Sequence, residues 1–296
     1  MKVAQFERDG QEWIGVQVDG RWINYTNAEA AYVLVEHGAS IEPATNLGSL
    51  IEEEGFEAEL FAKVVSFVKA HRLQRKFQQD GILKAPLSRP RKIVALGLNY
   101  ALHAKEGNFK VPKEPIIFAK AGSSVIGPEE MIRLPRGFGR MDHEVELAVV
   151  MGKKASGVRK RDAMKYVAGY TIANDVSARD QQTGDLEKKH PWFRSKSYDT
   201  FTPLGPWLVT ADEIRQPVRL DIECRVNGKR RQHANTREMV FDIPTQIEFI
   251  SRYITLEPGD IISTGTPEGI GPMKKGDTVV CRIQGIGELR NPVGYR

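Results

Sequence analysis

From residue 93 onward the chain consists of short apolar runs separated by glycine, proline and charged residues. Runs of this kind, bounded by turn residues, predict β-strands. A single helix is expected over residues 244–254, where Pro244 suits the first turn and Ile247, Ile250 and Ile254 share one face. Strands and helices do not alternate regularly and no segment repeats. The pattern therefore argues against a doubly wound parallel sheet and favours a β-rich barrel, roll or sandwich with few helices. The expected strands are Ile93–Leu98, Ile116–Ala119, Val145–Met151, Val167–Asn174, Trp207–Thr210, Leu220–Val226, Ile261–Thr264 and Thr278–Ile283.

The first 80 residues have a different pattern. Apolar and polar residues alternate around the turn signal Asp19-Gly20, which predicts a hairpin or meander, and helices are expected over 28–37 and 56–78. Gly81, Pro86 and Pro90 then interrupt any helix. We therefore predict a small N-terminal α+β domain (1–80), a linker (81–92) and a larger domain (93–296).

Composition places the chain among soluble globular proteins. Hydrophobic residues make up 41% of its 296 residues and charged residues 27%. No apolar run has the roughly 18–20 residues that a membrane span needs, and the first ten residues lack the apolar stretch of a signal peptide. The two cysteines, Cys224 and Cys281, are too few for a disulfide framework or a thiolate metal cluster. We expect a cytoplasmic protein with no membrane partner.

The net charge of +5 raises the question of nucleic-acid binding. The charge is uneven, because residues 1–68 carry a net −8, residues 69–92 a net +7 and residues 93–296 a net +6. The basic stretch has only Phe77 as an interleaved aromatic residue. This distribution argues against nucleic acid as a partner and favours a small anionic substrate for the larger domain.

Two glutamates in one expected strand are the first candidates for chemistry. In Asp142-His143-Glu144-Val145-Glu146, a strand puts Glu144 and Glu146 on the same side. One interpretation is a half-buried strand whose wet face is acidic. The other is a metal site, since two adjacent carboxylates need a hard cation such as Mg²⁺ or Mn²⁺ to stay ionised together.

Asp175 follows the apolar run 167–174 and has two possible roles. An aspartate at such a position is commonly a turn former or a helix cap. Beside Glu144 and Glu146 it would instead complete a set of three oxygen ligands.

His103 and Glu106 lie three residues apart after the strand that ends at Leu98, so they share a face of a helical turn. They form either a solvated ion pair or a general base whose imidazole is polarised by a carboxylate. Lys196, near Trp192 and Phe193, is either a surface lysine or a partly buried functional one.

A glycine- and proline-rich loop, 265–271, follows the expected strand 261–264. Its backbone N–H groups and the Thr266 hydroxyl could bind a carboxylate or a phosphate. Its spacing matches neither a P-loop nor a dinucleotide fingerprint.

Taken in order, seven segments resemble the fumarylacetoacetate hydrolase family over residues 93–292. They are GLNYALHAKE, PIIFAK, DHEVELAVVMGKKA, YVAGYTIANDVSARDQQ, PWFRSKSYDTFTPLGPWLV, VNGKRRQ and LEPGDIISTGTPEGIGP. The resemblance implies an α+β, mainly β fold, with a mixed β-roll or sandwich catalytic domain behind a small N-terminal α+β domain.

The resemblance also implies a site and an activity. It implies a catalytic His103–Glu106 pair assisted by Lys196, and a homodimer. It implies cleavage of a C–C bond in a 2,4-dioxo acid (an acylpyruvate or fumarylpyruvate) with Mg²⁺ or Mn²⁺. Decarboxylation of oxaloacetate, or isomerisation or decarboxylation of a 2-hydroxymuconate-type acid, remain alternatives at the same site. The implied metal ligands are Glu144, Glu146 and Asp175, and the implied residues that bind the small anionic keto acid are Arg179, Gln182 and Thr266.

Overall fold

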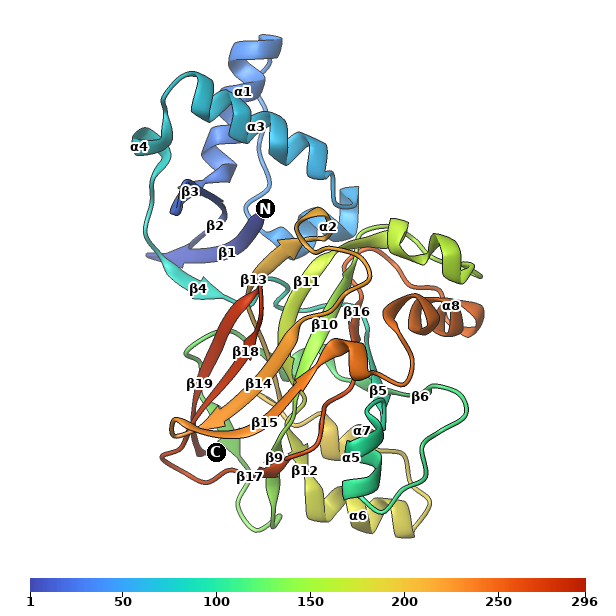
Figure 1. Cartoon of the computed structure of the whole chain (residues 1–296). Helices are drawn as coiled ribbons and strands as arrows, with labels where there is room; N and C mark the ends of the chain where they lie inside the picture. Colours follow the sequence, from blue (N-terminus) through green and yellow to red (C-terminus); the bar gives the residue numbers. More distant parts are fainter.

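The computed structural model describes the backbone of all 296 residues and every side chain except that of Glu54. The N-terminal part of the chain, residues 1–84, is called the head here and is coloured blue to cyan in Figure 1. It lies against a larger part rich in strands, called the body. None of the described helices is long and apolar enough to cross a membrane.

The head begins with an antiparallel meander. Its hairpin turns at Asp19 and Gly20, which both have positive φ (50° and 78°), the geometry that such a tight turn needs. The helix expected over 56–78 is interrupted, because the chain takes a left-handed conformation at Arg72 (φ 56°) and α3 ends before it. The elements of the head are β1 (Lys2–Arg8), β2 (Gln11–Val18), β3 (Arg21–Asn24), α1 (Tyr25–His37), α2 (Leu47–Glu54), α3 (Ala58–Ala70), α4 (Gln74–Phe77) and β4 (Ile82–Lys84).

One large sheet runs through head and body. Its strand order is β3-β2-β1-β13-β11-β10-β16-β5-β6, with β4 beside β1 and β7 beside β13. The expected strands of the body in this sheet are confirmed, and the one predicted at Trp207–Thr210 begins earlier, at Thr202. The strands from the body are β5 (Ile93–Gly97), β6 (Ile116–Lys120), β7 (Val125–Ile126), β10 (Val145–Met151), β11 (Val167–Asn174), β13 (Thr202–Thr210) and β16 (Ile261–Ser263).

A second, five-stranded sheet packs against the large one. Its order is β15-β14-β18-β19-β8, and a hairpin joins β14 to β15 at Asn227-Gly228, a residue pair that favours such a tight turn. Side chains of both sheets, such as Leu147 and Ile222, share one core. This arrangement confirms the α+β, mainly β fold. The strands are β8 (Ile132–Leu134), β14 (Asp221–Val226), β15 (Lys229–Asn235), β18 (Thr278–Ile283) and β19 (Gly287–Tyr295), and a small third sheet contains β9 (Met141–His143), β12 (Ser177–Ala178) and β17 (Gly271–Pro272).

Four helices lie outside the strands of the body. The helix expected over 244–254 is confirmed as α8 (Ile243–Tyr253), which Asp242 caps. The other three, α5 (Ala101–Glu106), α6 (Arg179–Glu187) and α7 (Phe193–Lys196), gather at the end of the body opposite the head (Figure 1). Short 3₁₀ turns complete the chain: η1 (Gly122–Ser124), η2 (Lys160–Tyr166), η3 (Ala211–Glu213) and η4 (Thr236–Glu238).

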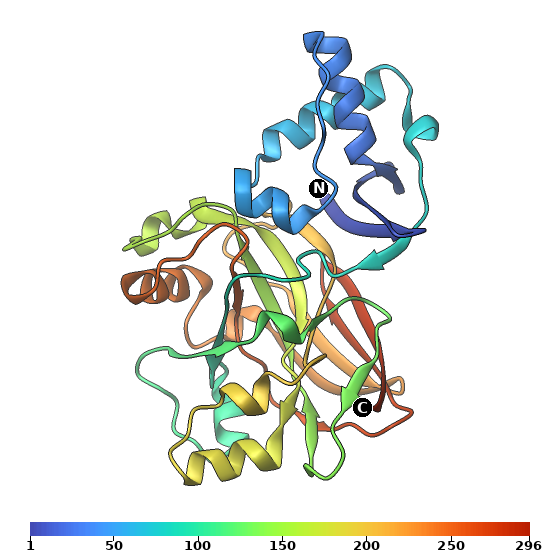
Figure 2. The same ribbon diagram turned by 180° about the vertical axis from the view of Figure 1, so that it is seen from behind.

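The head and the body meet through apolar side chains as well as through strand pairing. β1 pairs with β13 at Lys2 and Val3, and β4 lies within the segment predicted as a linker. Seen from behind in Figure 2, α2 lies at the junction. One core cluster joins side chains of α2 and α3 to the face of the large sheet that includes Val150, Leu208 and Ile261. The domain boundaries near residues 80 and 92 stay a prediction.

A truncated chain tests those boundaries. We expect residues 93–296 alone to aggregate, or to unfold at a clearly lower temperature than the whole chain, because removal of the head exposes Val150, Leu208 and Ile261. Size-exclusion chromatography and thermal unfolding of both chains measure this. A truncated chain that stays soluble with an unchanged unfolding temperature would show that the body folds independently.

Candidate active site

The pairing of β10 with β11 brings three carboxylates together. Val145 lies opposite Asn174 in the two antiparallel strands, so Glu144 and Asp175 face each other just beyond the paired ends, and Asp175 N donates to Glu144 O (2.8 Å). Glu146 points to the same side of β10 as Glu144. One carboxylate oxygen from each acid lies within 4.8 Å of the others. All three residues are at most 3% exposed, so neither an acidic wet face nor an exposed turn former describes them.

Two basic side chains neutralise part of this negative charge. Lys196 Nζ donates to Glu144 Oε2 (2.7 Å) and to Asp175 Oδ2 (2.6 Å), and Lys196 is 3% exposed rather than a surface lysine. Arg179 pairs with Glu144 and with Asp142, whose Oδ2 lies 2.8 Å from Arg179 Nε. Burial favours the neutral acid at Glu144, but Lys196 and Arg179 outweigh it and hold the Glu144 pKa far below its usual range. Burial also opposes the charge of Lys196, yet Asp175 and Glu144 raise its pKa.

A third base, Lys120, was not among the predicted site residues. It ends β6, is 4% exposed, and its Nζ donates to Asp175 Oδ1 (2.5 Å) and to Phe201 O (3.0 Å). Burial lowers the pKa of Lys120. The sequence signal that could have indicated it is the family-like stretch at residues 115–120, which ends in this lysine.

Glu146 is the acid of the three that lacks a basic partner among the described residues. Its Oε2 accepts hydrogen bonds from Ser263 Oγ (2.5 Å) and Gly265 N (2.9 Å), which leaves Oε1 for another ligand. Burial, with Asp175 beside it, raises the pKa of Glu146 to about 8. An additional positive charge would let all three acids ionise together. Because every donor atom is a carboxylate oxygen, the set fits Mg²⁺ or Mn²⁺.

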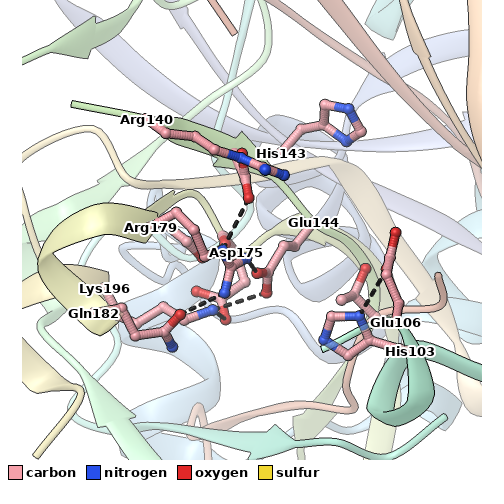
Figure 3. A network of polar contacts seen from close by, with 12 residues as sticks. His103, Glu106, Arg140, His143, Glu144, Asp175, Arg179, Gln182 and Lys196 are labelled. Carbon is pink, nitrogen blue, oxygen red and sulfur yellow. Dashed lines mark hydrogen bonds and ion pairs between the residues drawn. The ribbon is translucent and has the colours of Figure 1, made fainter. Parts of the chain in front are cut away.

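His103 projects from α5 towards these acids, and Glu106 lies behind it. Leu98 (φ 57°) turns the chain after β5 so that α5 lies across the ends of the strands. His103 Nδ1 lies 3.4 Å from Glu106 Oε2, and both Glu106 oxygens accept a hydrogen bond from Gly269 N (3.1 and 3.2 Å). In Figure 3 this pair lies on one side of the carboxylates, while Gln182 and Lys196 lie on the other.

A cavity of about 250 Å³ lies between His103 and the three carboxylates. Eight of the nine predicted site residues line it, and Glu106 lies behind His103. Thr266 is 3% exposed and lines the cavity, and Gln182 accepts a hydrogen bond from Arg179. The structure thus gathers every residue that the sequence predicted, although their roles stay predictions.

One wall of the cavity is apolar. A Cβ at Gly97 would lie 2.5 Å from the Trp192 ring, so only glycine lets that indole cover the end of β5. Arg194 of α7 donates to both carboxylate oxygens of Asp185 in α6. This ion pair connects the two helices and fixes the segment between them, which includes Trp192. The apolar lining consists of Leu96, Leu98, Phe109, Phe118, Leu186, Trp192 and Ile270.

Comparison with known proteins agrees with this geometry. Residues 92–294 match the family described as fumarylacetoacetate (FAA) hydrolase, C-terminal. The chain is 44% identical over 268 residues to the mitochondrial oxaloacetate tautomerase FAHD2B of Bos taurus, an alignment that covers 84% of this chain and 85% of that protein.

Two solved structures share the fold. The fumarylacetoacetate hydrolase of Exiguobacterium antarcticum superposes with a TM-score of 0.80 at 33% identity, with both chains fully covered. The maleylpyruvate hydrolase of Sphingobium sp. SYK-6, solved with manganese(II) and pyruvate, superposes with a TM-score of 0.75 at 33% identity, covering 100% of this chain and 99% of that one. The family model, the relatives and the buried acids lead to the same conclusion: this chain belongs to the fumarylacetoacetate hydrolase family.

Proposed function

We propose that this protein is a divalent-metal-dependent enzyme that interconverts the keto and enol forms of a small 2-oxo dicarboxylic acid such as oxaloacetate. The observation that carries the proposal is the placement of one imidazole, that of His103, across a small cavity from three buried carboxylates. The similarity to oxaloacetate tautomerases extends over head and body and supports this choice of substrate.

Glu144, Glu146 and Asp175 would hold the cation, Mg²⁺ or Mn²⁺. When bound, it would chelate the 2-oxo acid and lower the energy of the enolate that forms when a proton leaves the neighbouring carbon. The manganese and pyruvate in the Sphingobium hydrolase support both the choice of metal and the class of ligand.

His103 is the base in this proposal. Its Nδ1 faces Glu106, so Nε2 is the ring nitrogen left to accept a proton from carbon and return it to oxygen. Glu106, fixed by Gly269 N, orients the ring. Lys196, buried and positively charged, stabilises negative charge that develops on the substrate oxygen.

Hydrolysis of a 2,4-dioxo acid is the second candidate, and the likeness to the maleylpyruvate hydrolase favours it. There His103 would deprotonate a water, the hydroxide would attack the distal carbonyl, and the C–C bond would break to give pyruvate and a carboxylic acid. Lys196 and Gln182 would stabilise the oxyanion. Decarboxylation of oxaloacetate needs neither the water nor the imidazole.

A substrate panel separates these reactions. The purified, Mn²⁺-loaded protein is given oxaloacetate, acylpyruvates, fumarylpyruvate and a hydroxymuconate-type acid, and kcat/KM is measured for each. The proposal requires rapid keto–enol exchange of oxaloacetate, seen as a change in enol absorbance, without release of CO₂ or pyruvate. If kcat/KM for pyruvate production from an acylpyruvate exceeds that for oxaloacetate tautomerisation, hydrolysis becomes the preferred function. Light scattering of the same sample tests the expected homodimer.

Removal of one carboxylate tests the metal ligands. We expect Asp175→Asn to weaken Mn²⁺ binding at least about tenfold and to reduce turnover to near background, because a neutral amide replaces a charged ligand. Titration of Mn²⁺ followed by electron paramagnetic resonance measures binding without reference to turnover. Asp162→Asn, which removes an exposed acid paired with Lys165, is the matched control. Chelator treatment of the wild-type protein should abolish activity, and added Mn²⁺ should restore it.

Replacement of the imidazole tests the base. We expect His103→Asn to lower kcat for tautomerisation about 10²–10⁴-fold, the usual contribution of a general base, while Mn²⁺ affinity stays unchanged. His233→Asn, on the exposed face of β15, is the control and should keep full activity. Full turnover by His103→Asn would remove this histidine from the mechanism.

A further inference from the structure

Gln232 reaches the active site from the other sheet. It lies in β15, in the family-like stretch VNGKRRQ, and is 1% exposed. Val145 N, which can only donate, lies 3.1 Å from Gln232 Oε1, and Pro267 O, which can only accept, lies 2.8 Å from Nε2. These two contacts fix which end of the amide is oxygen and which is nitrogen.

The remaining capacity of the amide is also used. His143 Nδ1 lies 3.0 Å from Gln232 Oε1 and must donate to it, and Gln232 Nε2 donates to Thr266 Oγ1 (2.8 Å). The His143 ring points away from Glu144 and Asp175 (Figure 3). Gln232 thus joins the start of β10 to the loop that follows β16, with two bonds accepted and two donated.

These contacts determine what Thr266 can offer to a ligand. Because Gln232 donates to its hydroxyl, the hydroxyl proton must go elsewhere, and it is donated to Val145 O (2.9 Å). Among the described residues, the main-chain N–H of Thr266 has no hydrogen-bond acceptor, although the residue is 3% exposed and lines the cavity. The preceding Gly265 has φ 95°, and its own N–H is bound to Glu146. A buried N–H without a partner is suited to an anionic ligand.

We propose that Gln232 is a positioning residue for the Gly265–Thr266 loop, and that Thr266 binds the substrate carboxylate through its main-chain N–H rather than its hydroxyl. The hydroxyl serves to hold the loop in place through Gln232 and Val145. The inference rests on the proposed binding of a 2-oxo acid in this cavity but not on which reaction follows.

Oxalate, which resembles the carboxylate and oxo group of a 2-oxo acid, is the probe. Calorimetry gives its Kd in the presence of saturating Mn²⁺ for the wild type, Thr266→Ser, Thr266→Val, Gln232→Met and the double variant Thr266→Val/Gln232→Met. We expect Thr266→Ser to bind like the wild type, and each of the other single variants to bind about tenfold more weakly, the effect of losing one neutral hydrogen bond. The double variant should have a Kd for oxalate no higher than that of the single variant that binds more weakly, because both changes remove the same hydrogen bond between Gln232 and Thr266.

Other results would overturn the proposal. Multiplied effects in the double variant, about a hundredfold in all, would mean that the two side chains act independently. A loss in Thr266→Val much larger than in Gln232→Met would assign carboxylate binding to the hydroxyl, and wild-type affinity in Gln232→Met would remove its role. An equal loss of Mn²⁺ affinity in these variants would place the effect at the metal ligands instead.

Gln5→Met is the control for loss of a buried amide. Gln5 is 1% exposed in the head, where it donates to Thr45 O (3.0 Å) and accepts from Leu47 N (2.7 Å). Gln5→Met should lower the unfolding temperature and leave oxalate affinity unchanged, whereas Gln232→Met should change both. Oxalate binding needs no turnover, so wild-type protein that binds oxalate but fails to tautomerise oxaloacetate would contradict the proposed function and leave this inference open to the same test.

Discussion

The burial of three carboxylates beside one another is the constraint on which the rest of the site depends. Like charges at such short range, away from water, cannot all ionise unless positive charge lies next to them. Lys120 from β6, Arg179 from α6 and Lys196 from α7 supply part of it, and all three contact Glu144 or Asp175. Glu146, without such a partner among the described residues, is the group whose pKa burial raises. The imbalance that remains explains why the fold suits a cation.

Strands and helices contribute differently to this site. The acids lie on β10 and at the end of β11, deep in the large sheet, where neighbouring strands fix their positions. His103 lies on α5, and Leu186 and Trp192 of the apolar lining lie on the α6–α7 segment, at the end of the body away from the head. Two proteins named as hydrolases have similar backbones, and each is 33% identical to this chain in sequence. The strands therefore fix the acids, while the helical segments supply the imidazole and part of the apolar lining that a bound molecule would meet.

The sequence predicts this site where its chemistry is local. Alternation within one strand indicates the Glu144–Glu146 pair, and helical spacing indicates His103 with Glu106. It does not reveal contacts made across the fold, such as Lys120 with Asp175, 55 residues apart, because no local pattern records them. The Asn227-Gly228 signal indicates a hairpin, but the extent of β15 was not predicted, for a related reason. Only Gln232 and Ala234 of that strand are buried, so it has no hydrophobic run to detect.

The uneven charge of the chain also has a structural explanation. The basic segment 69–92 lies against acidic groups of head and body, and four of its bases bind acids of this chain: Lys69 with Asp19, Lys84 with Glu7 and Glu130, Arg91 with Glu52, and Lys92 with Asp260. Most of these pairs are exposed and contribute little to stability individually. The pair of Lys92 with the fully buried Asp260 differs, because removal of the lysine would leave a buried charge without compensation. This pair lies at the start of β5, the strand that leads to His103, so this one base of the segment stabilises the fold beside the candidate site.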